Sequence, residues 1–205
     1  MDRRAALAEG ALDYVLSHGL IGLSLRPLAA ALGTSDRMLI YHFGGKDELI
    51  TELVSLANAR LAEGMPPAEP EPETVADLVR YAWRAVNESG IAGVGRLYLE
   101  LCALSMGEPE RWRPAHRRLR EPWLVMLRGG LGELGARPDR VATLADLVLD
   151  TIDGLLLDRM VSGDAARTDA AAEAFVDLLQ GCRHGTPRSR PRAQPEAAGR
   201  PEPEP

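Results

Sequence analysis

The sequence predicts an all-α protein with about nine helices. Apolar residues recur at helical spacing along most of the chain, and no segment shows the clear alternation of a strand. Glycines, prolines and N-cap residues divide the chain into pieces of helical length. The length of 205 residues allows one or two domains. A Pro-rich connector at residues 65–73 follows a small N-terminal head and precedes a larger helical body.

The head is expected to begin with three helices. Apolar residues at i, i+1, i+4 and i+5 spacing predict an amphipathic first helix that ends at Gly19. Ser24 is a candidate N-cap for a short second helix that Gly33 ends. Ser35 should cap a third short helix that runs to Phe43. A longer helix then opens at residues 46–48.

The body is expected to contain five further helices, over residues 74–88, 91–106, 108–134, 138–160 and 168–180. Pro114 and Pro122 should kink or break the helix at 108–134, because proline lacks a backbone N–H. Pro138 should stand near the first position of the next helix, and Thr168 should cap the last one. Residues 183–205 carry no large apolar side chain, so a disordered tail is expected there.

Composition narrows the class of protein. The net charge of -6 excludes a uniformly basic nucleic-acid coat, although it leaves room for a local basic surface. Two cysteines, Cys102 and Cys182, exclude a disulfide-rich secreted scaffold, and inert thiols are favoured over a redox sensor. No apolar run is long enough to span a membrane, and the N-terminal segment lacks the apolar core of a signal peptide. We therefore expect a cytoplasmic protein with no membrane partner.

Residues 22–50 contain the pattern of a helix-turn-helix, two short helices joined by a glycine turn. Ala29 is small enough for the two helices to approach closely, and Gly33 allows the tight turn. The second helix is then free to lie in the major groove of DNA, which is about 12 Å wide. The alternative is a helical corner in an unrelated helical protein.

This stretch resembles the DNA-binding domain of the TetR family of transcriptional regulators, over roughly residues 5 to 55. The resemblance rests on the order and spacing of Gly19, Ser24-Leu25-Arg26, Leu28-Ala29, Leu32-Gly33, Ser35, Leu39, His42-Phe43, Lys46 and Leu49. It implies a helix-turn-helix DNA-binding domain at residues 1–47 and a helical ligand-binding and dimerisation domain at 48–182. The fourth helix would connect the two, and the tail at 183–205 would follow.

The resemblance implies that residues in and beside the second helix of the motif contact DNA. They are Arg26, Ser35, Asp36, Arg37, Met38, Tyr41, His42 and Lys46. Arg37 stands where the family usually has a small residue, and it could bind guanine O6 and N7. Ile40 replaces the family's usual tyrosine and so removes one aromatic contact. Lys46, the only lysine in the chain, resembles the family's phosphate anchor at a helix N-terminus. For His42, packing or capping is an alternative.

The family usually forms a homodimer that reads two half-sites of a palindromic operator. Two apolar helices near the C-terminus suit a four-helix bundle between subunits. The expected dimer interface consists of Val148, Ile152, Leu155, Leu156, Phe175, Val176 and Leu179. The alternative is that these helices only complete the core of the monomer.

The family's larger domain usually encloses a ligand cavity, and most aromatic residues of this chain lie after residue 80. A small apolar or amphipathic effector is therefore expected. The candidate ligand-binding residues are Trp83, Tyr98, Cys102, Met106, Trp123, Met126, Asp150 and Asp153. The two aspartates could meet a cation or a hydroxyl group, or they could form a solvated stripe with Asp146.

Together these observations predict a ligand-responsive, sequence-specific DNA-binding regulator, a repressor more readily than an activator. The sequence has no H-E-x-x-H, C-x-x-C, P-loop or G-x-S-x-G motif, so no enzyme activity, cofactor or metal is expected. The alternative is a helical small-molecule-binding protein or enzyme whose helix-turn-helix head serves protein contact.

Overall fold

The computed structural model describes residues 2–88 and 93–181, and within these residues it contains nine α-helices and no strand. The predicted all-α fold is confirmed. The helices are α1 (Arg3–His18), α2 (Leu25–Ala31), α3 (Asp36–Phe43), α4 (Lys46–Gly64), α5 (Val75–Glu88), α6 (Val94–Gly107), α7 (Pro109–Glu133), α8 (Val141–Ser162) and α9 (Ala165–Gly181). The expected tail at 183–205 and Cys182 lie outside the described residues.

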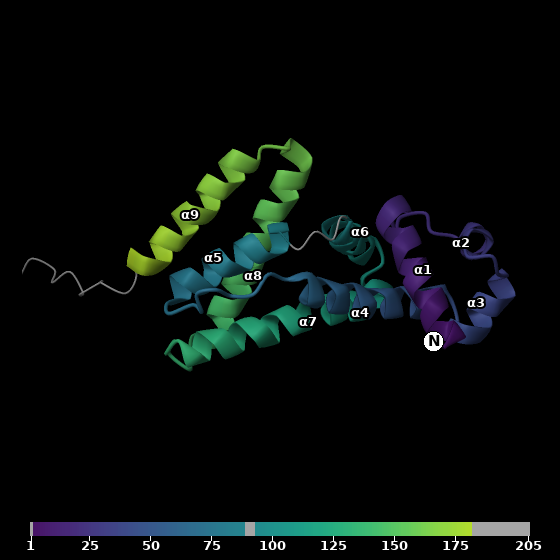
Figure 1. Cartoon of the computed structure of the whole chain (residues 1–205), viewed down its shortest axis with the longest axis horizontal. Helices are drawn as coiled ribbons and strands as arrows, with labels where there is room; N and C mark the ends of the chain where they lie inside the picture. The colour runs from purple at the N-terminus through teal and green to yellow at the C-terminus, as the bar shows by residue number, and fades with distance from the viewer. Residues whose placement is uncertain (1, 89–92, 182–205) are drawn as a thin grey trace, which may run out of the picture.

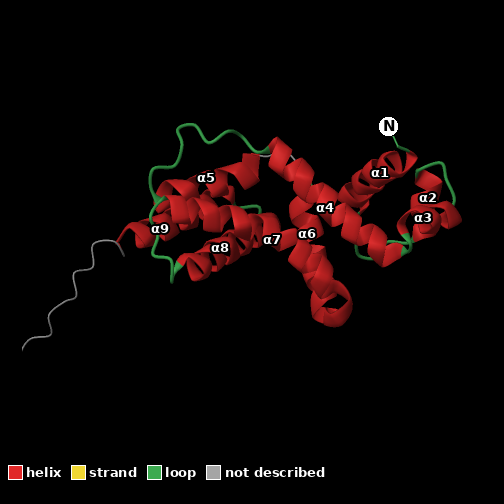
Figure 2. Cartoon of the chain, turned by 90° about the horizontal axis from the view of Figure 1, so that it is seen from below, coloured by secondary structure: helices red, strands yellow, loops and turns green. Residues whose placement is uncertain are grey.

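The molecule is elongated, with α1, α2 and α3 at one end and α5, α8 and α9 at the other (Figure 1). The helices α4, α6 and α7 lie between these two ends, as the view turned by 90° also shows (Figure 2). No helix in the described part of the chain is both long enough and apolar enough to cross a membrane.

Two apolar cores hold these elements together. The first core joins α1–α4 to α6 and to the N-terminal half of α7, and the second joins α5, α8 and α9 to the C-terminal half of α7. α7 supplies Trp112 and Leu119 to the first core, and Leu127 and Leu131 to the second. Because close-packed interiors transmit strain, α7 is a physical link between the two ends of the molecule.

The ends of the head helices follow from local chemistry. Ser35 caps α3 as expected, since its Oγ accepts a hydrogen bond from the backbone N–H of Met38 at 3.2 Å. Gly19 follows the end of α1 with a φ of 93°, a conformation that favours glycine. Ser24 stands at the N-cap of α2, although its side chain makes no capping hydrogen bond.

The expected start of the helix at 138–160 is wrong. α8 begins at Val141, and residues 138–140 form a turn before it. The backbone N–H groups of Arg140 and Val141 both donate to the carbonyl of Arg137, at 2.8 and 3.1 Å. Pro138 therefore stands inside a turn rather than in the first position of the helix.

The expected cap of the last helix is also wrong. α9 begins at Ala165, and Asp164 caps it by accepting a hydrogen bond from the backbone N–H of Arg167 at 3.0 Å. Thr168 is fully buried within the first turn, where its hydroxyl donates to the carbonyl of Ala165 at 2.9 Å. The predicted start of α6 falls partly outside the described residues, and the helix is seen from Val94 onward.

α7 continues through both of its internal prolines, so the expected break is absent. Pro122 has no N–H to donate to the carbonyl of Arg118. The side chain of Asn58 in α4 donates instead, to the carbonyls of Arg118 at 3.2 Å and Leu119 at 3.1 Å. The Oδ1 atom of Asn58 accepts a hydrogen bond from the indole N–H of Trp123 at 3.0 Å. Asn58 therefore joins α4 to α7 at the point where proline opens the helix.

Candidate DNA interface and ligand cavity

α3 presents an outward face that its own packing holds in place. Leu39 and Phe43 are buried beneath the helix, whereas the side chain of Arg37 is exposed on the other side. Tyr41 is 78% exposed and Ile40 is 48% exposed. Large exposed aromatic and aliphatic side chains on so short a helix are typical of a surface that a partner covers.

Most of the expected DNA-binding residues gather on this face and beside it. Arg26, Ser35 and Asp36 are exposed with Arg37 and Tyr41, and Met38 and Lys46 are half-buried. The hydroxyl of Ser35 is engaged in the cap of α3, which leaves its role structural in this conformation.

His42 is placed differently from the exposed residues of α3. Its side chain is half-buried, and its Nε2 atom is buried with no hydrogen-bond partner among the described residues. The ring packs edge-on against Tyr41, with 5.2 Å between ring centroids. The geometry therefore favours packing for the ring of His42.

Two arginines that the sequence analysis did not single out brace the head. Arg4 in α1 pairs with Glu52 in α4, and its Nε donates to the carbonyl of His42 at 3.1 Å. Arg60 in α4 pairs with Glu9 of α1 and with Asp13 of α1. These contacts fix α1 and the end of α3 against α4. Sequence spacing gives no signal for such pairs because their members lie far apart in the chain.

α6 holds the turn that joins α1 to α2. Glu100 accepts hydrogen bonds from the backbone N–H groups of Leu20 and Ile21, the latter at 3.0 Å, and it pairs with Arg96 at 2.7 Å. Burial would raise the pKa of Glu100, but these donors hold the pKa below its usual range. Arg96 also donates to the carbonyl of His18 at 3.1 Å. A displacement of α6 would therefore move the turn that precedes α2, where the helix-turn-helix begins.

The N-terminus of α4 is held by α7. Asp47 follows Lys46 in the first turn of α4, and both of its carboxylate oxygens accept hydrogen bonds from Arg111, at 2.7 and 2.8 Å. The hydrogen bonds from this guanidinium lower the pKa of Asp47 from its usual value. The bidentate pair fixes the position of Lys46 relative to the body.

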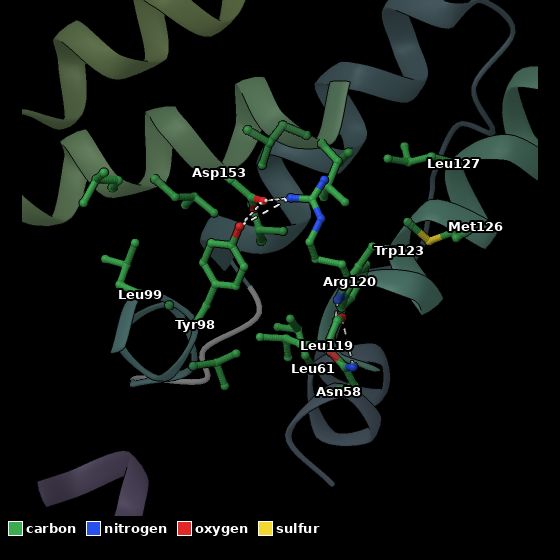
Figure 3. Close-up of a pocket in the computed structure, with 18 of the residues that line it drawn as sticks. Asn58, Leu61, Tyr98, Leu99, Leu119, Arg120, Trp123, Met126, Leu127 and Asp153 are labelled. Carbon is green, nitrogen blue, oxygen red and sulfur yellow. Dashed lines mark hydrogen bonds and ion pairs between the residues drawn. The ribbon is translucent and has the colours of Figure 1, made fainter. Parts of the chain in front are cut away.

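A partly open cavity of about 130 Å³ lies among α4, α5, α6, α7 and α8 (Figure 3). Its lining is mostly apolar and includes Leu61, Leu99, Leu119 and Leu127. A mostly apolar cavity with a few convergent polar groups is typical of a small-molecule site.

The polar groups of the cavity converge on Asp153 (Figure 3). The hydroxyl of Tyr98 donates to its Oδ2 atom at 2.6 Å, and Nη1 of Arg120 donates to the same oxygen at 2.9 Å. Nη2 of Arg120 donates to Oδ1 of Asp150 at 2.6 Å. Burial raises the pKa of Asp153 and of Tyr98 above their usual values. This cluster joins α6, α7 and α8.

Four of the expected ligand-binding residues line the cavity: Tyr98, Trp123, Met126 and Asp153. Asp150 lies outside the lining, with its side chain 63% exposed and paired with Arg120.

The other three candidates also lie outside the lining. The indole N–H of Trp83 donates to Asp169 in α9 at 2.9 Å, so Trp83 ties α5 to α9. Met106 is 80% exposed near the end of α6, and Cys102 is half-buried with a pKa that burial raises. Most of the apolar lining was not predicted, and two polar lining residues, Asn58 and Arg120, were also missed. Arg120 belongs to a stretch of charged residues whose composition is typical of a solvated surface. Only the folded structure shows that the Arg120 side chain faces the cavity.

The expected dimer residues need correction. Val148, Ile152 and Val176 are almost completely buried in the second core of the chain itself, so they are not available to a partner. Leu156, Phe175 and Leu179 are half-buried and pack against the same core, and Leu155 is half-buried. The apolar residues that α8 and α9 do expose are Leu147, Leu157, Met160, Val161 and Leu178. Periodicity identified apolar helices, but it could not distinguish the face turned to the chain's own core.

No group of three or more His, Cys, Asp or Glu side chains within the described residues could hold a metal ion.

A family model described as "Bacterial regulatory proteins, tetR family" matches residues 7–53, which cover most of α1, all of α2 and α3, and the beginning of α4. The chain is 26% identical over 184 residues to the HTH-type transcriptional repressor AcnR of Corynebacterium glutamicum. That alignment covers 87% of this chain and 90% of AcnR.

Two solved structures share the fold. The multidrug binding protein EbrR complexed with proflavin has a TM-score of 0.61 and 23% identity, covering 86% of this chain and 99% of that one. The regulator FadR from Bacillus subtilis in complex with stearoyl-CoA has a TM-score of 0.64 and 17% identity, covering 86% of this chain and 97% of that one. At these identities the likeness concerns the fold alone.

Proposed function

We propose that the chain is a ligand-responsive transcriptional repressor of the TetR family that binds a palindromic operator as a homodimer. The match of residues 7–53 to the family model and the likeness to the repressor AcnR support this proposal. Residues 1–47 act as the DNA-binding head, and residues 48–182 act as the ligand-binding and dimerisation domain with α4 as connector. The observation that carries this proposal is the exposed face of α3, braced from behind by ion pairs and buried leucine and phenylalanine.

α3 reads base edges in the major groove. Arg37 suits a bidentate contact with guanine, and the exposed ring of Tyr41 suits contact with the sugar-phosphate backbone or a thymine methyl group. Asp36 lies at the same end of the helix and accepts from cytosine N4. Each good bidentate contact discriminates against a wrong base by about 1–3 kcal/mol.

Few cations are free to neutralise phosphates. Arg4 and Arg60 are committed to ion pairs within the chain. The other cations of residues 2–60, the first range that the structure describes, form no ion pair there: Arg3, Arg26, Arg37 and Lys46. With Arg37 assigned to a base, the other three give three phosphate contacts in each subunit. For a dimer, the slope of log affinity against log salt concentration is then no steeper than about -5.

A homodimer supplies the second recognition helix. A single short helix discriminates weakly, and two heads placed about one helical turn of DNA apart, near 34–36 Å, read a palindrome. The exposed apolar residues Leu147, Val161 and Leu178 on α8 and α9 are the surface we assign to the partner subunit.

The effector binds in the cavity, and α6 carries its effect to the head. Tyr98 faces the cavity, whereas Arg96 and Glu100 on the same helix hold the turn between α1 and α2. A ligand that binds more tightly to a state with displaced α6 shifts the protein away from DNA. Two solved structures with the same fold, those of EbrR and FadR, hold the organic ligands proflavin and stearoyl-CoA, and an organic effector is consistent with that fold.

The test is selection of bound duplexes from a random DNA pool by the purified protein at physiological salt. We expect an enriched inverted repeat. The variant that combines Arg37→Ala with Tyr41→Ala should lose most of the preference for that repeat. Arg140→Ala is the matched control, because Arg140 is exposed in the turn before α8, far from the head. Absence of enrichment with the folded dimer, or unchanged preference in the double variant, would contradict the proposal.

A further inference from the structure

At the polar end of the cavity, negative charges outnumber positive charges. One guanidinium, that of Arg120, serves two carboxylates, those of Asp150 and Asp153. The side chains of Arg120 and Asp153 are only 18% and 19% exposed, whereas that of Asp150 is 63% exposed. The buried carboxylate therefore shares its single cation with a second carboxylate that water also solvates.

This imbalance favours a positive ligand over a negative one. An anion would have to displace a carboxylate from Arg120 and would lie against Asp153, where two like charges repel at low dielectric. A cation could take the place of Arg120 at Asp153, while Arg120 keeps its bond to Asp150. The raised pKa of Asp153, caused mainly by burial, indicates that Arg120 alone does not fully compensate the cost of burying this carboxylate.

The walls of the cavity also suit a cation with an apolar body. Tyr98 and Trp123 supply aromatic rings, and cations bind favourably over such rings. The indole of Trp123 is fixed by its hydrogen bond to Asn58. Three methionines, Met65, Met126 and Met160, add polarisable surface that adapts to flat ligands.

The volume of the cavity determines how large a part of a ligand it can enclose. Its volume of about 130 Å³ is close to that of an engineered cavity of about 150 Å³ that binds benzene. Without rearrangement, the space accommodates one aromatic ring with a small substituent.

We propose that the cavity takes a compact organic cation, an aromatic amine or amidine, whose charge pairs with Asp153 in place of Arg120. This rests on the proposed function only in treating the cavity as the effector site. In the free protein, the guanidinium of Arg120 occupies the position of the ligand's charge. Its displacement breaks the bond between α7 and α8 at Asp153 and removes the hydrogen bond that Nη1 of Arg120 donates to the Tyr98 hydroxyl of α6 at 3.4 Å.

The experiment uses three probes of nearly equal shape and different charge: benzamidine, benzamide and benzoate. Their affinities for the wild-type, full-length protein are measured by ligand-observed NMR titration at pH 7. We expect benzamidine to bind at least about tenfold more tightly than benzamide, which corresponds to one charge-assisted interaction, and benzoate to bind most weakly. Equal affinities, tighter binding of benzoate, or no binding of benzamidine at about 10 mM would each overturn the proposal.

Variants then locate the charge. Asp153→Asn should weaken benzamidine binding about tenfold or more, whereas Asp146→Asn, an exposed aspartate on the same helix, should leave it unchanged. Arg120→Met removes the competing guanidinium and should tighten benzamidine binding. If Arg120→Met instead abolishes benzamidine binding, the placeholder role of Arg120 is wrong. Should Asp153→Asn fail to fold, the order of the three probes on the wild-type protein still decides.

DNA binding is measured on the same preparations by selection from the random pool. If benzamidine fails to bind while an inverted repeat is enriched, the proposed ligand class is wrong, but the proposed function as a DNA-binding regulator is supported. If no DNA is enriched but benzamidine binds through Asp153, the cation site stands and the regulator does not.

Discussion

Asn58 offers a quantitative test of how α4 and α7 are joined. The residue is only 8% exposed. Its side chain takes part in three hydrogen bonds, with the carbonyls of Arg118 and Leu119 and with the indole N–H of Trp123. Asn58→Ala removes all three and leaves the Arg118 carbonyl without a donor, because Pro122 has no N–H. At about 0.5–1.5 kcal/mol for each bond, the free energy of unfolding should fall by about 2–4 kcal/mol.

Thermal denaturation followed by circular dichroism, at fixed protomer concentration, measures this loss. For a chain of this size each kcal/mol lowers Tm by about 2–4 °C, so a decrease of about 5–15 °C is expected. Asn87→Ala is the matched control. Among the residues that the structure describes, the amide of Asn87 bonds only to the carbonyl of Trp83 in its own helix, at 2.7 Å. Its removal should cost less than about 1 kcal/mol.

The role of proline is tested by a double-mutant cycle. Pro122→Ala supplies the missing N–H to the carbonyl of Arg118, so the cost of Asn58→Ala should be smaller in that background by at least about 0.5 kcal/mol. Equal costs in the two backgrounds, or a loss no larger than that of Asn87→Ala, would refute the reasoning that Asn58 replaces the donor that proline removes.

Three further predictions concern DNA, the dimer and pH. Lys46→Ala should weaken binding to every duplex by a similar factor. It should also reduce the slope of log affinity against log salt concentration by the amount that one phosphate contact in each subunit contributes. An altered sequence preference in the selection assay would contradict a phosphate role. Leu178→Glu places a charge on the exposed apolar face of α9 and should shift the dimer toward monomer in sedimentation velocity, whereas an unchanged dimer would exclude this face as the interface. The affinity for benzamidine should fall as the pH is lowered toward the raised pKa of Asp153, because the carboxylate must be ionised to bind a cation; an affinity independent of pH would count against Asp153. The groups that face Asp153 or pack beside it are Tyr98, Cys102, His116, Arg120 and Asp150.

These neighbours leave the sign of the pH effect unchanged. Tyr98 and Cys102 have pKa values raised by burial, so both remain neutral in acid. Burial and the charge of Arg120 lower the pKa of His116, which delays its protonation to lower pH. Once protonated, His116 would repel a cationic ligand and would add to the loss of affinity. Acidification therefore weakens benzamidine binding through both Asp153 and His116.

The head could be predicted in detail because its structure depends on residues close together in the chain. Spacing of 3.6 residues in a turn puts Leu39 and Phe43 inward and Arg37 outward on α3. The cap at Ser35 and the stop at Gly19 depend on backbone groups within a few residues. Such local rules determined the all-α class, the helix-turn-helix and the exposed face of its second helix.

The body could not be predicted in the same way. The continuity of α7 through Pro122 depends on Asn58 in another helix, and no local rule contains that contact. Arg120 lies in a stretch of charged residues that resembles a solvated surface. For Asp153, which lies in a mostly apolar helix, the sequence left a ligand contact and a solvated stripe as alternatives. Only packing of α6, α7 and α8 brings the two side chains together with Tyr98 in a cavity.

The sequence by itself determined which segments are helical, where most of them end, and which face of α3 is exposed, because hydrogen bonds and side-chain directions within a helix are set by near neighbours. Tertiary structure decided which apolar residues of α8 and α9 face the chain's own core and which charged side chains are buried in the cavity. Val148, Ile152 and Val176 have the same apolar character as Leu147 and Leu178, yet they are buried and the latter two are exposed. That difference depends on which helix lies opposite, and contacts between distant segments exist only after the chain has folded.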